Sequence, residues 1–292
     1  MRVAVIDLGT NSTRLLVAEV AGGRVKTLLT DMVTTRLGEN IGGGYLLERA
    51  VTRTIVVLRK FLETASSWRA ERVTAVATSA VRGARNRQEF LQEAGKETGL
   101  EIRVLTGEEE AFYGFQGVKS ALPGAADGKK IVVVDVGGGS TEFCWENNQH
   151  LFFRSVDVGA VRAAEGQFTK EQMASLFSPV WEEIRFFAPG LVVGVGGTVT
   201  TLAAMAQRLE VYDSSLVHGF VLTREQVSGL FSMLMQTPLA ERRRLPGLQP
   251  ERADIIVAGT QIVLLTMDGL AQKTMLVSEA DLLYGVALEL SK

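Results

Sequence analysis

A chain of 292 residues with 46% hydrophobic side chains is long enough to bury one large core or two ordinary ones. Its formal net charge of -2 excludes a general nucleic-acid coat, so a polyanionic ligand would have to be bound by local cations. A single cysteine, Cys144, excludes an internal disulfide, and two histidines, His150 and His218, make a zinc site or a histidine-centred triad hard to build.

The start of the chain and its apolar runs bear on its location. The first apolar run begins at once and includes the acid Asp7, unlike the charged and then apolar signal segment of an exported protein. The longest apolar run, residues 255–267, is far below the roughly 20 residues that span a bilayer. We therefore expect a cytoplasmic protein with no membrane or nucleic-acid partner, and a buried helix over residues 255–267.

Hydrophobic periodicity predicts an α/β chain. The elements expected in the first half are strands at 2–8, 13–20, 24–33, 73–77 and 102–105 and helices at 45–68 and 111–120. Those expected in the second half are strands from 131, at 151–158, from 191 and at 274–277, and helices at 169–187, from 198, from 223, at 255–267 and at 282–290. Residues 122–128, with the sequence LPGAADG, form the best linker candidate, so we place a domain boundary after Gly124.

The segment IVVVDVGGGSTEF at residues 131–143 predicts a buried strand that ends in a loop of phosphate size. The glycines at 137–139 leave the backbone amides uncovered, and such amides can hold phosphate oxygens as an anion nest. Asp135 and Glu142 flank this loop, and Mg²⁺ is usually held by one or two carboxylates plus substrate phosphates. The alternative is a glycine-rich hairpin with a solvated glutamate.

The same pattern occurs near the N-terminus. Residues 7–13, with the sequence DLGTNST, repeat the order Asp-x-Gly-x-x-Ser-Thr of residues 135–141 between two apolar runs. A third glycine turn at residues 196–198 follows an apolar run and opens a helical one, and helix N-termini bind anions. The duplication predicts two similar domains that face each other across a cleft.

Six segments in this order resemble the exopolyphosphatase and guanosine pentaphosphate phosphohydrolase family: DLGTNST, TSAVRGARN, TGEEEA, VVVDVGGGSTEF, GVGGTVTTLAA and RADIIVAG. That family belongs to the actin-like ATPase and sugar-kinase superfamily, and the resemblance covers essentially the whole chain. It implies two actin-like, ribonuclease H-like domains with mixed sheets and flanking helices around a central cleft. Domain I is expected at residues 1–124 and domain II at 125–278, with 279–292 as a terminal helix that crosses back to domain I.

The resemblance implies a magnesium-dependent phosphatase that removes the terminal phosphate of inorganic polyphosphate or of guanosine pentaphosphate. Mg²⁺, or Mn²⁺ in its place, is expected at Asp135 and Glu142, and Asp7 is expected to hold a second metal or a water. The phosphate-binding residues expected in the three loops are Thr10, Asn11, Ser12, Gly137, Gly138, Gly139, Ser140, Gly196, Gly197 and Thr198.

Glu110 stands where the family carries its catalytic glutamate, which the resemblance suggests orients or deprotonates the attacking water. Thr106 and Glu109 have the spacing of a capping box, so Glu109 is expected to cap the N-terminus of the helix. The alternative is that all the acids at 108–110 only complement the helix dipole.

Arg82 matches the family's motif arginine, and its planar fork suits bidentate phosphate contact. The alternative for Arg82 is a solvated basic helix start, which is also the expected role of Arg85 and Arg87. The run 242–244, three arginines, could meet polyphosphate, but a surface cluster is the preferred interpretation. The chain departs from the family at 283–284, where it has Leu-Tyr and the family usually has Arg-Glu.

We therefore expect an exopolyphosphatase, with guanosine pentaphosphate phosphohydrolase as the alternative. A superfamily kinase would transfer the phosphate to an acceptor, and a protein that only senses a nucleotide or phosphate is a further alternative. Because the chain stops at Lys292, without the extra helical domains of longer family members, we expect a preference for short polyphosphates and distributive cleavage of long ones. A homodimer could restore a longer channel.

Overall fold

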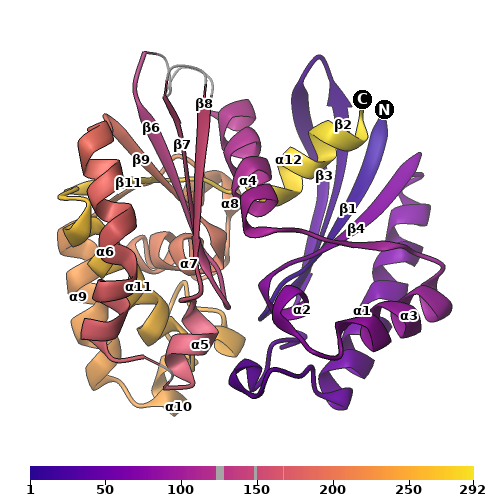
Figure 1. The fold of residues 1–292 in the computed structure, drawn as a ribbon, viewed down its shortest axis with the longest axis horizontal. Coiled ribbons are helices and arrows are strands. Elements are labelled where there is room, and N and C mark those ends of the chain that lie inside the picture. Colours follow the sequence, from indigo (N-terminus) through magenta and orange to yellow (C-terminus); the bar gives the residue numbers. More distant parts are fainter. Residues whose placement is uncertain (123–127, 148–149, 167) are drawn as a thin grey trace. The chain divides into compact units, whose positions relative to one another are not determined.

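The computed structural model describes residues 1–122, 128–147, 150–166 and 168–292. The chain forms two compact units, and one of them contains both ends of the chain, drawn in indigo and yellow in Figure 1. Unit 1 contains residues 1–121 and 282–292, and unit 2 contains residues 122–281. The expected boundary after Gly124 lies outside the described residues.

Unit 1 is built on a mixed sheet of five strands in the order β3-β2-β1-β4-β5. The strands are β1 (Arg2–Leu8), β2 (Thr13–Ala21), β3 (Arg24–Val33), β4 (Arg72–Ala77) and β5 (Ile102–Val104). Strand β2 is antiparallel to both β1 and β3, whereas β1, β4 and β5 are parallel to one another. The antiparallel start of the chain is therefore confirmed.

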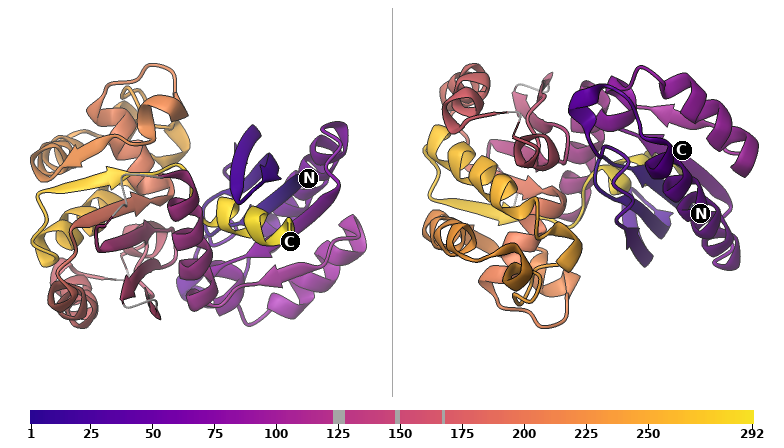
Figure 2. Two further views of the ribbon diagram at one scale, coloured as in Figure 1. Left: turned by 90° about the horizontal axis from the view of Figure 1, so that it is seen from above. Right: turned by 90° about the horizontal axis from the view of Figure 1, so that it is seen from below.

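Helices cover both faces of this sheet because the side chains of a strand alternate between its faces. The helices are α1 (Glu48–Ser67), α2 (Ser79–Gly83), α3 (Arg87–Thr98), α4 (Gly107–Ala121) and α12 (Leu282–Leu290), with the 3₁₀ turn η1 (Ile41–Gly43). Ala4 and Ile6 of β1 lie in a core with α1, α2 and α3, whereas Val3 and Val5 lie in a core with α4 and α12. Figures 1 and 2 show α12 beside α4.

Unit 2 repeats this plan with a mixed sheet of six strands in the order β10-β11-β9-β6-β7-β8. The strands are β6 (Ile131–Val136), β7 (Thr141–Asn147), β8 (His150–Val156), β9 (Leu191–Val195), β10 (Val221–Thr223) and β11 (Thr274–Val277). Like β1 to β3, strands β6 to β8 are antiparallel, and β9 then joins β6 in parallel as β4 joins β1. Two α/β units of the same plan agree with the expected fold class.

The helices of unit 2 pack on its sheet around one large apolar core. They are α5 (Ala160–Ala164), α6 (Lys170–Phe187), α7 (Gly196–Ala206), α8 (Ser214–Val217), α9 (Arg224–Gln236), α10 (Leu239–Arg242) and α11 (Ile256–Gly269), with the 3₁₀ turn η2 (Pro250–Arg252). Phe143, Phe177 and Trp181 lie in this core. The capping boxes of α6 and α9 are both present, and α11 is the expected buried helix.

Some elements differ from the sequence expectation. Helix α1 begins at Glu48 rather than at residue 45, because the side chain of Asn86 accepts from the Leu46 amide and donates to the Leu46 carbonyl at 2.9 and 3.0 Å. Those two bonds hold the backbone outside the helix. Helix α3 and strand β10 were not expected: α3 buries only Phe90 and Ala94, so its hydrophobic period is weak, and β10 has only three residues.

Helix α12 belongs to unit 1, although the chain reaches it from unit 2. The Tyr284 hydroxyl lies 2.6 Å from the hydroxyl of Thr27, and Glu289 pairs with Arg103 at 3.1 Å. Leu283 is buried in the core that contains Tyr113. The two residues that depart from the family pattern therefore pack within unit 1.

Gly285 tests the packing of α12 against α4, because a Cβ there would lie 2.0 Å from the Tyr113 carbonyl oxygen. We expect Gly285→Ala to lower the free energy of unfolding by about 1–3 kcal/mol or more, since overpacking forces the backbone to move. Gly229 in α9 is the matched control, because a Cβ there meets nothing within 4 Å. Gly229→Ala should stabilise by about 0.5–1 kcal/mol in denaturant titrations. Equal effects of the two substitutions would contradict this packing.

Candidate functional site

Each unit has a glycine loop, residues 9–12 in unit 1 and 137–140 in unit 2, and both loops are closed by the same hydrogen bond. In unit 1 the Gly9 amide donates to the Ser12 carbonyl, and in unit 2 the Gly137 amide donates to the Ser140 carbonyl, both at 3.0 Å. The duplicated sequence pattern therefore corresponds to a duplicated turn. One expectation needs correction: the Gly137 amide is used within the turn and does not face a ligand.

The segment that follows the third strand of unit 2 binds the carbonyl groups of its glycine loop. The amides of Ala160 and Val161 donate to the carbonyls of Gly137 and Gly138 at 2.9 and 2.8 Å. The Nε of Arg162 donates to the Gly139 carbonyl at 2.7 Å. Three successive carbonyls of the loop are thus fixed from the side of α5.

This contact requires a glycine at position 159. A Cβ at Gly159 would lie 2.5 Å from the carbonyl carbon and oxygen of Gly138. The backbone of the α5 segment can therefore approach the loop only without a side chain at this position. Unit 1 has a similar close approach, since a Cβ at Gly38 would lie 2.3 Å from a methyl carbon of Thr10.

Unit 1 fixes its loop in the same way. The Gly38 amide donates to the Thr10 carbonyl and the Arg36 amide donates to the Asn11 carbonyl, both at 2.8 Å. Thr10, Asn11 and Ser12 are all buried. In both units, the chain that follows the third strand holds carbonyl groups of the loop.

Because a peptide group is planar and trans, its N–H points away from its C=O. The bound carbonyls of residues 137–139 therefore turn the amides of Gly138, Gly139 and Ser140 to the opposite side of the loop. In unit 1 the amides of Asn11 and Ser12 are turned in the same way. None of these five amides donates a hydrogen bond to any described residue, so each loop presents donors of the kind that bind an anion.

The acids beside the two loops have different partners. Asp135 and Glu142 are directly opposite each other in the β6–β7 pair, and Glu142 accepts a hydrogen bond from Ser155 at 2.7 Å. Asp7 holds the corresponding place in unit 1, but it is opposite Arg14, and the two form an ion pair at 2.7 Å. Unit 1 thus neutralises its acid with an arginine, whereas unit 2 places two carboxylates face to face.

Like charges directly opposite each other in an antiparallel pair are destabilising, and a cation between them removes that cost. Mg²⁺ needs one or two carboxylates together with waters and substrate phosphates, so Asp135 and Glu142 fit such an ion. Among the described residues, no group of three or more His, Cys, Asp or Glu side chains could hold a metal ion by itself. A pair of carboxylates suits a metal whose remaining ligands are waters and substrate phosphates.

The third loop opens helix α7 at Gly196. No side chain of a described residue caps this helix end with a hydrogen bond, so the amides of its first turn are not held by the usual N-cap hydroxyl or carboxylate. A Cβ at Gly196 would lie 2.4 Å from Oδ1 of Asp135, so the helix end adjoins the acid pair. Thr198 in this turn is buried.

The guanidinium of Arg252 lies over Gly197, where a Cβ would come within 2.3 Å of both of its terminal nitrogens. Arg252 is only 8% exposed and donates from Nε to Gln249 at 2.9 Å. The sequence interpretation assigned it no role, although it stands in the quoted RADIIVAG segment. The available signal was an arginine three residues before the long apolar run 255–267, since a charged side chain in such a place is seldom buried without a partner or a function.

Arg82 and Glu110 contact each other. Arg82, in α2, donates to the Glu110 carboxylate and, at 2.9 Å, to the carbonyl of Leu105. Glu110 is in the first turn of α4, and its side chain is 13% exposed. The structure thus brings together the expected catalytic glutamate and the expected phosphate ligand, and the solvated alternative for Arg82 is wrong. The ion pair fixes the position of the carboxylate.

Glu109 takes the capping role, as expected. Its carboxylate accepts from the Thr106 amide at 2.8 Å, its amide donates to the Thr106 hydroxyl at 3.1 Å, and it also pairs with Arg103. Burial raises the pKa of Glu109, but the Thr106 amide and Arg103 outweigh it and hold the pKa below its usual value. Glu109 and Glu110 are therefore neighbours with separate partners.

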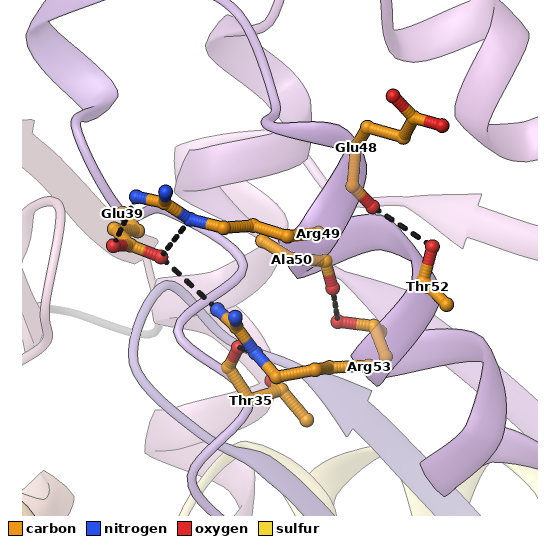
Figure 3. Close-up of polar contacts among 8 residues, drawn as sticks. Thr35, Glu39, Glu48, Arg49, Ala50, Thr52 and Arg53 are labelled. Atoms are coloured by element: carbon orange, nitrogen blue, oxygen red, sulfur yellow. Dashed lines mark hydrogen bonds and ion pairs between the residues drawn. The ribbon is translucent and has the colours of Figure 1, made fainter.

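A cluster of charges anchors the segment that holds the unit 1 loop. Figure 3 shows Glu39 between Arg49 and Arg53 of α1, with ion pairs at 2.6 and 3.1 Å. Arg53 also donates to the Thr35 carbonyl at 3.0 Å, and the Thr35 hydroxyl lies 2.9 Å from that of Thr13. The hydrogen bond from Arg49, with a smaller contribution from Arg53, holds the pKa of Glu39 below its usual value. These contacts connect α1 to the segment whose amides bind Thr10 and Asn11.

Other residues considered in the sequence have structural roles. Arg85 lies over the Tyr45 ring at 5.7 Å, and Arg87 donates to the Arg82 carbonyl at 3.4 Å. Arg242 donates to the carbonyls of Leu234 and Thr237, whereas the two arginines that follow it are exposed. Burial raises the pKa of the Cys144 thiol. In the described part of the chain, no helix is both long and apolar enough to cross a membrane.

Comparison with known proteins decides the family. The sequence model of the Ppx/GppA phosphatase family matches residues 16–292, nearly the whole chain. The chain belongs to the Ppx/GppA phosphatase family. The resemblance found in the six sequence segments is confirmed, and so is the expected enzyme class, a phosphoanhydride hydrolase.

Curated relatives of the Ppx/GppA family match at about the same level. Exopolyphosphatase 2 of Mycobacterium tuberculosis is 33% identical over 318 residues, which cover 99% of this chain and 98% of that protein. A bifunctional 3-dehydroquinate synthase/phosphatase of Fusobacterium nucleatum is 32% identical over 313 residues. The match covers 98% of this chain and only 46% of the Fusobacterium protein, so this chain spans less than half of that relative.

Solved Ppx/GppA structures confirm the fold. The Aquifex aeolicus PPX-GPPA enzyme is 35% identical, with a TM-score of 0.80 and 99% coverage of both chains. An exopolyphosphatase from Cytophaga hutchinsonii is 27% identical, with a TM-score of 0.89 and coverage of 99% of this chain and 98% of that one. The fold is therefore two actin-like units with mixed sheets and flanking helices, as expected.

Proposed function

We propose that the protein is an exopolyphosphatase that hydrolyses the terminal phosphoanhydride bond of inorganic polyphosphate, using Mg²⁺ and a water activated by Glu110. The observation that carries this proposal is the loop at 137–139 of unit 2. Its bound carbonyls turn three amides outward, and the facing carboxylates of Asp135 and Glu142 stand beside it.

Phosphoryl transfer depends mainly on positioning and on charge stabilisation, because the protein does little covalent chemistry in it. The amides of 138–140 and the first turn of α7 serve to hold the oxygens of the terminal phosphoryl group. Arg252 adds a positive charge next to the α7 turn. Within unit 1, the outward amides of Asn11 and Ser12 are a corresponding set of donors.

Glu110 is the general base of this proposal. Its carboxylate accepts the proton of the attacking water, and the Arg82 guanidinium holds that carboxylate in a fixed orientation. Arg82 is accordingly a positioning residue first, and its remaining donors can contact a phosphate oxygen. Glu109 is assigned the capping role instead, because one of its carboxylate oxygens accepts from the Thr106 amide and the other pairs with Arg103.

Asp135 and Glu142 hold the divalent ion, with Mg²⁺ as the expected metal and Mn²⁺ as a substitute. When bound with the substrate, the ion neutralises charge on the phosphate oxygens. Asp7 is the weaker candidate ligand, because Arg14 already neutralises it. The family is generally dependent on divalent metals, which supports a metal at the facing pair.

The substrate assignment favours polyphosphate over guanosine pentaphosphate because the full-length relative of Mycobacterium tuberculosis is named an exopolyphosphatase. We further infer a preference for short chains. Exposed cations such as Arg243 and Arg244 can hold a long polyanion only through contacts that salt screens. Cytoplasmic location and a homodimer stay predictions.

The proposal is tested by phosphate release from polyphosphate with no acceptor present. We expect release in Mg²⁺, faster with short chains than with long ones at equal end concentration, and none with excess EDTA. Release only in the presence of a sugar or acid acceptor would identify a kinase, and absence of release under every condition would indicate a non-catalytic protein. Release that persists in EDTA would contradict the metal assignment.

Glu110→Gln removes the base but keeps the size of the side chain, so kcat should fall by at least about a hundredfold while the fold stays intact. Glu109→Gln is the matched control, because glutamine also completes a capping box, and it should retain most of the activity. Arg82→Gln breaks the same ion pair and leaves the base, so its kcat should fall less than that of Glu110→Gln. Equal losses in the two glutamate variants would refute the base assignment.

A further inference from the structure

Among the described residues, Arg162 is the only one whose side chain donates a hydrogen bond to a carbonyl of the glycine loop of unit 2. It stands in α5, directly after the two amides that bind the carbonyls of Gly137 and Gly138. The Arg162 amide also donates to the Gly138 carbonyl, at 3.3 Å, and does not reach the next carbonyl. That third carbonyl, of Gly139, is bound by the Arg162 side chain. The backbone of α5 therefore fixes two peptide groups of the loop, and a guanidinium fixes the third.

The Arg162 guanidinium brings a full positive charge to this carbonyl. No carboxylate among the described residues forms an ion pair with it, so this charge is not cancelled by a neighbouring acid. The side chain is half-buried, which limits screening by water. The Gly139 carbonyl thus receives a charge-assisted hydrogen bond, which is about twice as strong as a neutral one.

A strong donor at one end of a peptide group affects the other end. Hydrogen bonds in a chain polarise one another, so a cation at the Gly139 carbonyl makes the N–H of the same peptide a better donor. That N–H belongs to Ser140, and the planar peptide directs it away from Arg162. The Ser140 amide donates to no described residue and is one of the three amides turned outward.

We propose that Arg162 is a positioning residue that fixes and polarises the Gly139–Ser140 peptide so that the Ser140 amide donates strongly to the transferred phosphoryl group. Arg162 acts through this peptide and does not itself touch the phosphate. The inference rests on the proposed function for its substrate, but the geometry that carries it concerns phosphate binding by the loop alone. No other described arginine donates to a carbonyl of this loop.

The experiment compares three substitutions at position 162 in the full-length protein with Mg²⁺. Arg162→Met keeps the length and removes the donor, Arg162→Gln keeps a neutral donor, and Arg162→Lys keeps the charge without the planar fork. Two measurements are made on each: calorimetry gives the affinity for inorganic phosphate, and steady-state kinetics on short polyphosphate gives kcat and KM. Thermal unfolding of each variant shows whether it is folded.

Arg185 gives the matched control. It is an exposed arginine at the end of α6, and it donates from Nη1 to the carbonyl of another glycine, Gly269, at 3.0 Å. Arg185→Met therefore removes the same kind of hydrogen bond from the same unit without touching a glycine loop. A purely structural role of such a bond would change the unfolding of both variants and the phosphate affinity of neither.

We expect Arg162→Met to lower phosphate affinity and kcat by at least about tenfold, since deleting one oxyanion donor costs about a hundredfold to a thousandfold and here the donor is weakened. Arg162→Gln and Arg162→Lys should fall between Met and the wild type, and Arg185→Met should match the wild type in both quantities. Wild-type phosphate affinity and kcat in folded Arg162→Met, or in Arg162→Gln if the Met variant does not fold, would overturn the inference.

The two measurements separate this inference from the proposed function. If the protein hydrolyses polyphosphate and the Arg162 variants lose neither affinity nor kcat, the function stands and the positioning role falls. If the protein does not hydrolyse polyphosphate but Arg162→Met still binds inorganic phosphate more weakly, the role in phosphate binding stands and the proposed substrate falls. A wild-type protein that binds no inorganic phosphate would overturn the positioning role.

Discussion

The planar peptide group is the constraint on which both glycine loops depend. In each unit, the segment after the third strand binds loop carbonyls, and the planar geometry then turns the attached amides the other way. Gly159 and Gly38 make this possible, because a Cβ at either position would collide with the loop. The anion-binding character of the loops therefore does not reside in their own sequence alone. It also depends on a second segment, 20 or more residues away, whose position the sheet fixes through its third strand.

The two units share this construction but differ in the charges that surround it. In both units, the residue seven positions after the loop aspartate lies opposite it in the strand pair, and this residue is Arg14 in unit 1 and Glu142 in unit 2. A single exchange of charge thus converts a neutralised pair into a pair of facing carboxylates suited to a divalent cation. Unit 2 also contains the third loop and Arg252, and unit 1 contains Glu110 and its partner Arg82. The two copies of one hairpin therefore differ in the charge opposite the loop aspartate, and only the copy in unit 2 has the carboxylate pair suited to a metal.

Features that depend on neighbouring residues were predictable from the sequence, and contacts between distant segments were not. The Thr106–Glu109 capping box and the opening of α7 at Gly196 follow from local spacing, and both are present. The Arg82–Glu110 pair joins α2 to α4, and Arg252 reaches Gly197 from η2, so neither contact is encoded in any short pattern. For Gly137 the sequence predicted an amide that binds phosphate, but this amide donates to the Ser140 carbonyl within the turn. The weakly periodic α3 and the three-residue β10 lack the signals on which sequence inference depends.

The central claim is that the amides of Gly138, Gly139 and Ser140 bind phosphate because their peptide groups are turned outward. Amide NMR of ¹⁵N-labelled protein, titrated with inorganic phosphate in the presence of Mg²⁺, tests this most directly. The account predicts large shifts for these three amides, a smaller shift for the Gly137 amide held by Ser140, and none for Gly22 and Gly23 in the turn between β2 and β3. Saturable phosphate binding that leaves residues 138–140 unshifted would contradict the account.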